Sequence, residues 1–323
     1  MGKQRLSVAM CTYNGAQYLR EQLDSIASQT RLPDELVVCD DRSHDDTIEI
    51  VKTFASKAPF PVRLTINEEN LGSTKNFEKA IELCEGDIIA LSDQDDVWHP
   101  EKLMRIEAVF STSPRIGAVF TDAEVVDEDL YPLGYRLWQS VRFSRIEQKR
   151  VTKGSAVKVL LKHNVVTGAT MAFRAEFKEL ILPIPASWVH DGWIALIIAF
   201  LADLAIIHEP LIKYRQHSKN QIGAIRKGFG QQLTKAKQTD SNTYITGLNQ
   251  YMAAHERLLT ISNGSYHKEV ISQLEAKMAH LHARADMPKR QLQRLPMVIK
   301  ELVTLRYHRY SNGWKSAAKD LFL

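Results

Sequence analysis

The chain of 323 residues contains 44% hydrophobic and 25% charged residues, an ordinary globular composition that can bury one large or two modest cores. No apolar stretch of about 18 uncharged residues predicts a membrane span, and no signal-peptide pattern precedes the first predicted strand. The three cysteines, Cys11, Cys39 and Cys84, form no C-x-x-C pair, which argues against a zinc site and for a reducing compartment. We therefore expect a cytoplasmic protein.

The net charge of +4 is unevenly distributed. Residues 1–212 carry 23 Lys and Arg against 31 Asp and Glu, whereas residues 213–323 carry 19 against 7. A basic segment after an acidic one suggests contact with anions such as nucleic acid, phospholipid or pyrophosphate. Aromatic residues are not interleaved with the basic ones, and no zinc-finger or RNP-like pattern occurs, so nucleic acid is not expected as a partner.

Strands and helices alternate in the first part of the chain. Short apolar runs predict the strands, and apolar residues at helical spacing predict the helices. The predicted order is strand 6–11, helix 17–28, strand 35–39, helix 47–55, strand 62–66, helix 75–84 and strand 88–91. This alternation predicts a mostly parallel sheet covered by helices on both faces. Because neither G-x-G-x-x-G nor a Walker A loop follows the first strand, the usual nicotinamide and ATP sites are disfavoured.

Polar residues follow the first two strands directly. Thr12-Tyr13-Asn14-Gly15 comes after the first strand, and Asp40-Asp41 after the second. Tyr13 can stack on a flat base, and a carboxylate at a strand end can accept a hydrogen bond from a ribose hydroxyl or a base N–H. For the residues that follow, a structural role is the alternative, since Ser43 and Asp46 have the spacing of a capping-box variant. The structural and functional interpretations of Asp40-Asp41 both stay open.

An acidic cluster, Asp93-Gln94-Asp95-Asp96, follows the strand 88–91 and precedes a helix predicted to begin near Pro100. Like charges oppose one another's ionisation, so three neighbouring carboxylates predict a positive charge close by. In open α/β sheets ligands gather at the carboxyl ends of strands, and Mg²⁺ or Mn²⁺ there binds one or two carboxylates together with substrate phosphate. The alternative is a solvated turn that caps the next helix.

Two later segments carry further candidate chemistry. Asp191 lies in Val189-His190-Asp191-Gly192-Trp193, directly before an apolar helical run, where helix capping is its structural alternative. The strand-like segment 209–217 ends in Tyr214-Arg215-Gln216-His217.

Several segments together resemble the nucleotide-sugar domain of family-2 glycosyltransferases with the GT-A fold. They occur in the family's order at fitting spacings, and the match spans most of residues 5–220. The resemblance implies an α/β GT-A domain over residues 1–225, with a nucleotide-sugar half at 1–110 and an acceptor half at 111–225. A basic helical region would follow at 226–323. The matching segments are Ser7-Val8-Ala9-Met10-Cys11-Thr12-Tyr13-Asn14, Val37-Val38-Cys39-Asp40-Asp41-Arg42-Ser43, Asn70-Leu71-Gly72 and Leu91-Ser92-Asp93-Gln94-Asp95-Asp96.

The resemblance implies roles for individual residues in donor binding. Those that line or border the nucleobase pocket would be Cys11, Thr12, Tyr13 and Asp41. Those near the sugar-diphosphate would be Lys75, Asp93, Gln94, Asp95 and Arg215. Asp95, Asp96 and His217 would hold a divalent cation, Mg²⁺ or Mn²⁺. The family usually has a small residue where Gln94 stands, which leaves the division of labour among the three acids open.

The resemblance also implies a catalytic base and an acceptor site. Asp191 would deprotonate the acceptor hydroxyl, and a single base opposite the leaving group implies inversion at the anomeric carbon. Residues 164–173, with Gly168, resemble the strand that borders the acceptor. The His190-Asp191-x-Trp193 pattern resembles the rhamnosyltransferase subgroup.

These features predict an inverting transferase that moves a sugar from a nucleotide-diphosphate donor to a glycan or lipid-linked saccharide in bacterial surface polysaccharide synthesis. The donor would be dTDP-rhamnose, and a UDP-hexose or UDP-N-acetylhexosamine is the alternative. A nucleotidyltransferase is a further alternative, but the loop after the first strand is poorly suited to a triphosphate. A non-catalytic nucleotide-sugar-binding domain is the remaining one.

The C-terminal part, from about Gly228, is predicted to be helical and basic. Its apolar residues recur at helical spacing and are flanked by Lys and Arg. Such a helix fits the anionic inner face of a membrane, but it fits equally well a surface packed on the catalytic domain or on a second copy in a homo-oligomer. The apolar residues are Leu292, Leu295, Val298, Ile299, Leu302 and Leu305.

Overall fold

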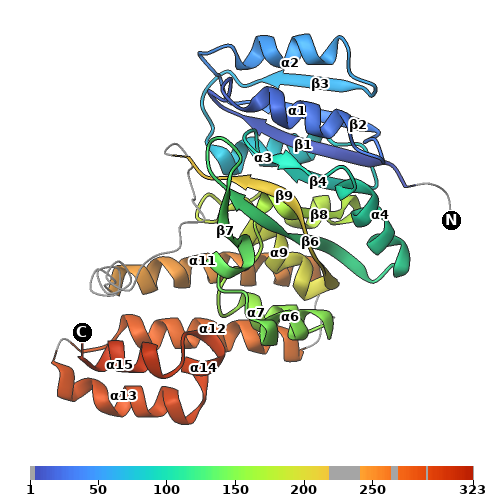
Figure 1. Cartoon of the computed structure of the whole chain (residues 1–323). Coiled ribbons are helices and arrows are strands. Elements are labelled where there is room, and N and C mark those ends of the chain that lie inside the picture. The colour runs from blue at the N-terminus through green and yellow to red at the C-terminus, as the bar shows by residue number, and fades with distance from the viewer. Residues whose placement is uncertain (1–3, 218–240, 263–267, 289, 323) are drawn as a thin grey trace. The chain divides into compact units, whose positions relative to one another are not determined.

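The computed structural model describes residues 4–217, 241–262, 268–288 and 290–322 (Figure 1). The chain folds into two compact units. Unit 1 consists of residues 1–156 and 165–225, and unit 2 of residues 157–164 and 226–323. The domain boundary predicted between residues 225 and 226 falls within 218–240, outside the described residues. None of the described helices is long and apolar enough to cross a membrane.

The first half of unit 1 is a parallel sheet. Its strands are β1 (Leu6–Thr12), β2 (Glu35–Asp40), β3 (Val62–Ile66) and β4 (Ile88–Ser92), and they lie in the order β3-β2-β1-β4 (Figure 1). All residues of β2 and β4 are buried, which agrees with their unbroken apolar runs. The predicted strands are therefore confirmed.

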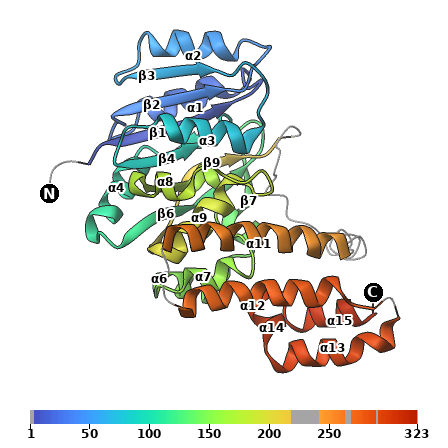
Figure 2. The same cartoon turned by 180° about the vertical axis from the view of Figure 1, so that it is seen from behind.

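Three helices connect these strands: α1 (Leu19–Ala27), α2 (Thr47–Ala55) and α3 (Ser73–Leu83). The chain steps outward from β1 to β2 and β3, and then returns to β4 on the other side of β1. Because crossovers between parallel strands are right-handed, this reversal places α1 and α2 on one face of the sheet and α3 on the other. Helix α1 accordingly lies in front of the sheet in Figure 1, and α3 in front in Figure 2.

The second half of unit 1 extends the same sheet with mixed strands. They are β5 (Val97–Trp98), β6 (Ile116–Val126), β7 (Pro132–Arg136), β8 (Met171–Arg174) and β9 (Asp203–Arg215). The described sheet has nine strands in the order β3-β2-β1-β4-β8-β6-β9-β5, with β7 paired to β6. Strand β8 is antiparallel to both β4 and β6, whereas β6 and β9 pair in parallel, so this half of the predicted mostly parallel sheet is mixed. The α/β fold with this curled, helix-flanked sheet is confirmed.

The helical segments of this half are mostly short. They are α4 (Lys102–Thr112), α5 (Leu137–Ser140), α6 (Arg145–Thr152), η1 (Gly168–Thr170), η2 (Ala175–Phe177), α8 (Lys178–Ile181) and α9 (His190–Leu201). Helix α7 (Ala156–Leu160) belongs to unit 2 except for its first residue. The strand predicted over 164–173 begins only at Met171, because η1 occupies the preceding residues. Helix α9 is buried on almost every side, as its apolar sequence requires.

Unit 2 is helical, as the sequence predicts for the C-terminal part. Its helices are α11 (Ser241–Ser262), α12 (Lys268–Ala285), α13 (Gln291–Val303), α14 (Arg306–Tyr310) and α15 (Trp314–Phe322). Helix α11 packs along α12, and α13 contacts α14 and α15. A small apolar core consists of Val298, Tyr307 and Ala317, against which Met287 and Leu302 pack.

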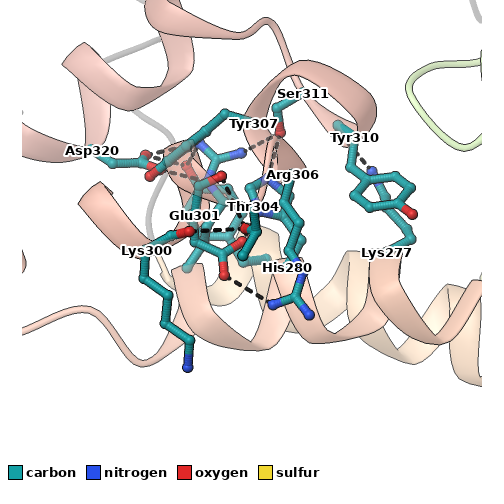
Figure 3. Close-up of polar contacts among 12 residues, drawn as sticks. Lys277, His280, Lys300, Glu301, Thr304, Arg306, Tyr307, Tyr310, Ser311 and Asp320 are labelled. Atoms are coloured by element: carbon teal, nitrogen blue, oxygen red, sulfur yellow. Dashed lines mark hydrogen bonds and ion pairs between the residues drawn. The ribbon is translucent and has the colours of Figure 1, made fainter. Parts of the chain in front are cut away.

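A buried polar network joins the helices of unit 2 (Figure 3). Asp320 accepts hydrogen bonds from Arg284 at 2.6 and 2.8 Å and from the Tyr307 hydroxyl at 2.7 Å. Glu301 contacts Nδ1 of His280 at 2.6 Å and accepts from Arg306 at 3.1 Å. Since every carboxylate oxygen involved has a partner, these charges can be buried without an unpaired group.

The burial of Lys277 lowers the stability of unit 2. The Lys277 ammonium donates to the Tyr310 carbonyl at 2.9 Å (Figure 3). Burial, and secondarily the charge of Arg284, lower the pKa of Lys277 from 10.5 to about 7. Between these two values the unfolded chain binds more protons than the folded one, so Lys277 makes stability rise with pH.

Lys277→Met is accordingly expected to stabilise unit 2, and to do so more at pH 7 and below than at alkaline pH. The gain in unfolding free energy should shrink by about 2 kcal/mol between pH 7 and pH 9, as the wild-type lysine becomes neutral in the fold. Urea unfolding of the full chain at several pH values, with hydrogen exchange of the α12 amides to report on unit 2, measures this. A gain that does not vary with pH would contradict the assignment.

Candidate active site

The strand order reverses between β1 and β4, and the candidate residues lie at this switch point. Met10 pairs with Ser92 across the two strands, so the loops that follow them begin side by side. On the other side of β1, Thr12 pairs with Asp40. Ligands of open α/β sheets bind outside the carboxyl ends of the strands at such a reversal. The predicted base-pocket and acidic segments are therefore brought to one edge.

The loops after β1 and β2 are joined by hydrogen bonds. The Thr12 hydroxyl donates to Asp40 at 2.7 Å, and the Asn14 N–H donates to the Ser43 hydroxyl oxygen at 2.8 Å. Ser43 in turn donates to Asp40, both from its N–H and from its hydroxyl, at 2.7 Å. The capping box predicted for Ser43 and Asp46 is wrong, because Asp40 holds Ser43 and the N-cap Asp46 makes no side-chain cap bond.

Asp41 is buried and shapes the loop at residues 67–72. Its carboxylate accepts from the Asn67 amide at 2.9 Å and from the N–H groups of Leu71 and Gly72 at 2.7 and 2.8 Å. A carboxylate offers about four acceptor positions, so these bonds leave about one for a ligand. The structure thus gives Asp41 a scaffolding role that sequence inspection did not predict.

Gln94 clamps the loop after β1 to the acidic loop. Its side chain accepts from the Tyr13 N–H at 2.8 Å and donates to the Tyr13 carbonyl at 3.1 Å, while the Tyr13 side chain is 43% exposed. Gly15 leaves room for this amide, since a Cβ there would lie 2.2 Å from Oε1 of Gln94. The unusual size of Gln94 therefore has a structural reason: it fixes the backbone that presents Tyr13.

The acidic cluster, which predicts a positive charge close by, has the amine of Lys102 as a neighbour. This side chain is fully buried at the start of α4, donates to the Ala169 carbonyl at 2.8 Å and lies 3.4 Å from the ring centroid of Trp98. Burial lowers its pKa, whereas the charges of Asp96 and Asp93 oppose that effect. The sequence analysis missed Lys102 because a lysine in a first helical turn gives no sign of its burial.

Burial and mutual repulsion raise the pKa of two carboxyls of the acidic cluster. Desolvation, followed by the charges of Asp95 and Asp191, raises the pKa of Asp93 to about 7. Desolvation and its two acidic neighbours raise the pKa of Asp96 well above its usual value. Asp96 accepts from the Arg215 N–H at 3.1 Å through Oδ1, and its buried Oδ2 has no hydrogen-bond partner among the described residues.

Asp95 and His217 form the candidate metal pair. Oδ2 of Asp95 lies 2.8 Å from Nε2 of His217, whose ring lies 5.0 Å from that of Tyr18. Within the described ranges, no three His, Cys, Asp or Glu side chains converge on a potential ion position. A carboxylate and an imidazole, with the unpartnered Asp96 oxygen nearby, nevertheless fit Mg²⁺ or Mn²⁺, which takes its other ligands from water and phosphate.

Arg215 ties the acidic loop to the rest of the site. Its side chain is buried, donates to the Asp95 carbonyl at 2.7 Å and forms an ion pair with Glu21. It also donates to the Glu128 carbonyl, and its guanidinium lies 4.5 Å from the Tyr18 ring centroid. These contacts fix the loop that carries Asp95.

Asp191 lies in the first turn of α9, two residues beyond the N-cap. The N-cap is Val189, so the capping alternative for Asp191 is wrong. Oδ2 of Asp191 accepts from the Gly168 N–H at 3.1 Å, and its charge acts on Asp93. The helix dipole stabilises a carboxylate at this position.

His190 and Gly168 shape the surroundings of Asp191. The His190 ring stacks on Phe77 with centroids 4.0 Å apart, and burial lowers its pKa to about 3, so it is neutral. A Cβ on Gly168 would lie 2.6 Å from Nε2 of His190, which explains the glycine. The neutral His190 ring therefore borders the Asp191 carboxylate without adding a charge.

Four carboxylates lie close enough to Tyr214 for their charges to act on its hydroxyl. This tyrosine is buried on β9, and its pKa is raised well above the usual value, first by burial and then by the charges of the four acids. Asp191 therefore belongs to the same site as the acidic loop, although it lies about a hundred residues further along the chain. Sequence inspection gave no chemical role to Tyr214. The four acids are Asp93, Asp96, Asp95 and Asp191.

Lys75 and Cys11 are the remaining residues predicted to bind the sugar donor. The Lys75 ammonium contacts Glu78 at 2.8 Å and donates to the Ile184 carbonyl at 2.8 Å, and both of these partners lie outside the acidic loop. Cys11 is half-buried at the end of β1, and burial raises the pKa of its thiol well above its usual value. This thiol is therefore protonated at neutral pH, which makes it a poor nucleophile.

The family model described as "Glycosyl transferase family 2" matches residues 7–179. Among curated proteins, an uncharacterized glycosyltransferase of Nostoc sp. is 28% identical over 77% of this chain and 74% of its own length. The dTDP-rhamnosyl transferase RfbG of Shigella flexneri is 26% identical over 67% of this chain and 74% of its own length.

Two solved structures have a similar fold. Residues 1–349 of S. aureus TarS in complex with UDP-GlcNAc align with a TM-score of 0.58 at 17% identity, over 94% of this chain and 81% of that one. The mannosyltransferase PcManGT from Pyrobaculum calidifontis, in complex with GDP-Man and Mn²⁺, aligns with a TM-score of 0.53 at 19% identity, over 95% and 76%.

Proposed function

The chain belongs to glycosyl transferase family 2, and from this premise we propose that it is a metal-dependent, inverting hexosyltransferase-type enzyme. It would move a sugar from a nucleotide-diphosphate donor to a hydroxyl of a glycan or lipid-linked saccharide. The observation that supports this most is that the charge of Asp191 acts on Asp93, and that Asp191 and the three acids of the loop after β4 all act on Tyr214. One site thus contains a candidate base and the carboxylates that would meet a diphosphate.

Each residue of this site would have a distinct task. Asp191, held by the Gly168 N–H, would take the proton from the acceptor hydroxyl. Asp95, Asp96 and His217 would hold Mg²⁺ or Mn²⁺, which when bound supplies Lewis-acid stabilisation of the diphosphate leaving group. Arg215 would keep the acidic loop in place through the Asp95 carbonyl. An acceptor hydroxyl that attacks the anomeric carbon from the face opposite the leaving group gives inversion at that carbon.

For the donor we propose dTDP-rhamnose. Support comes from the sequence similarity to RfbG and from the His190-Asp191-x-Trp193 pattern. A UDP-hexose or UDP-N-acetylhexosamine is the second candidate, because the similar TarS fold was solved with UDP-GlcNAc. Tyr13 would stack on the base, with Cys11 and Thr12 beside it, whatever the sugar. The cytoplasmic location and the homo-oligomer remain predictions.

A panel of nucleotide-sugars, each supplied with Mg²⁺ or Mn²⁺ and saccharide acceptors, tests this proposal. Release of nucleoside diphosphate and the anomeric configuration of the product, read by NMR, report donor and stereochemistry. One donor turned over with inversion supports the proposal. Binding of a donor without turnover under any condition would instead favour a non-catalytic binding domain.

Gln94→Ala is expected to weaken donor binding more than chemistry. Loss of both hydrogen bonds to the Tyr13 backbone should raise KM for the donor about thirtyfold, since each such bond contributes about 1 kcal/mol, and leave kcat nearly unchanged. Gly15→Ala should mimic this effect, because the new Cβ displaces the Gln94 amide. An unchanged KM in both variants would show that the clamp does not order the donor site.

A further inference from the structure

Helix α13 presents an apolar face to solvent. Leu292 and Val303 are 89% and 77% exposed, and Leu295 and Ile299 are 43% and 50% exposed. At 3.6 residues per turn these four positions follow one side of the helix. We call these four residues the outer stripe.

The opposite side of α13 is already occupied. Val298 and Glu301 are buried, Val298 packs with Tyr307 and Ala317, and Leu302 packs partly against them. In both views of the chain α14 and α15 lie between α13 and α12 (Figures 1 and 2). An ordinary surface helix turns its polar face to water after burying its apolar one. Helix α13 departs from this rule, which marks the outer stripe as an interaction surface.

The charges around the outer stripe have one sign. Residues 290–322 contain seven Lys and Arg and two acids, Glu301 and Asp320. Both acids are buried, at 1% and 6% exposure, and bonded to Arg306 and Arg284 within the network of Figure 3. The segment therefore shows solvent only its basic charges. The exposed bases are Arg290, Lys300, Arg309 and Lys315.

We propose that the outer stripe of α13 lies in the interface of an anionic phospholipid membrane, with the exposed bases contacting lipid phosphates. An apolar stripe buried at the headgroup boundary and flanked by Lys and Arg is how a helix lies on such a surface. A second copy fits less well, because two outer stripes facing each other would also bring their basic flanks together. The inference adds to the proposed function, since a lipid-linked acceptor would lie at the same surface.

Vesicle binding by the full-length protein tests the proposal without any sugar donor. Sedimentation with vesicles of phosphatidylcholine containing a third phosphatidylglycerol should show binding, and pure phosphatidylcholine should not. Leu292→Gln with Val303→Gln should weaken binding about tenfold or more. Lys300→Gln with Arg309→Gln should weaken it about thirtyfold, at about fivefold per charge.

Matched controls lie in unit 1, where Leu133 and Ile146 are exposed apolar residues and Lys52 and Lys57 exposed bases. The corresponding double glutamine variants should bind vesicles like the wild type, and all variants should keep the wild-type melting temperature because they remove exposed side chains. Equal binding to neutral and anionic vesicles, or unchanged binding by the outer-stripe variant, would overturn the proposal. So would a dimer in sedimentation velocity that dissociates in that variant. Neither result would affect the donor-panel test of transferase activity.

Discussion

Asp191→Asn is expected to lower kcat for sugar transfer by about three orders of magnitude, within the 10²–10⁴-fold contribution of a positioned general base. Asparagine keeps the size of the side chain and can still accept from the Gly168 N–H, but it cannot take a proton. Donor affinity should change little, because the base acts on the acceptor. Initial rates of nucleoside diphosphate release and donor binding by calorimetry together measure this split.

The control for Asp191 is Asp24→Asn. Asp24 is an exposed aspartate on α1, so its replacement removes the same charge away from the site and should leave kcat unchanged. Full transferase activity in Asp191→Asn would show that another group is the base. A parallel loss of donor binding would instead indicate that Asp191 supports the fold of the site.

Asp95→Asn is expected to remove metal-dependent activity almost entirely, with a loss of about 10³-fold or more. The variant keeps the shape of the loop but loses the carboxylate next to His217, and Lewis-acid stabilisation of a leaving group is worth several kcal/mol. His217→Gln should have a smaller effect, since the carboxylates would remain. Mn²⁺ binding followed by electron paramagnetic resonance, in the presence and absence of nucleoside diphosphate, measures the metal step separately from turnover.

Melting temperature separates this loss from unfolding. Because the Asp95 carbonyl, and not its carboxylate, accepts from Arg215, Asp95→Asn should retain the loop and melt like the wild type. Wild-type Mn²⁺ binding in this variant would remove Asp95 from the metal site. Activity that is equal with and without divalent cation in the wild type would show that the reaction needs no metal.

The sequence predicted the parallel half of the fold closely, because its signal is local. The strands β1 to β4 are uninterrupted apolar runs, and each acid of the loop after β4 could be named from its place after such a run. Strands β6 and β7 were not predicted. Strand β6 pairs with β8 and β9, whose residues are 50 or more positions away, and no local pattern reports such a pairing.

The roles that escaped prediction share this cause. Gln94 contacts Tyr13 across 81 positions, and Lys102 contacts Ala169 across 67, so their roles depend on the completed sheet. At Ser43 a local pattern predicted a contact that the structure does not contain. The spacing of Ser43 to Asp46 fits a local cap, but the nearby Asp40 carboxylate offers a charged acceptor, and hydrogen bonds to charged groups are the stronger ones.

Lys102 gives the acidic loop a basic group that cannot diffuse away. A dissolved cation reaches carboxylates only in proportion to its concentration, whereas the Lys102 amine, anchored in α4 by its bond to the Ala169 carbonyl, is present in every molecule from the moment the sheet forms. The loop can therefore keep its shape between turnovers, when product has left and no donor is bound. The divalent cation proposed for catalysis would exchange with solvent, whereas Lys102 is a permanent part of the chain.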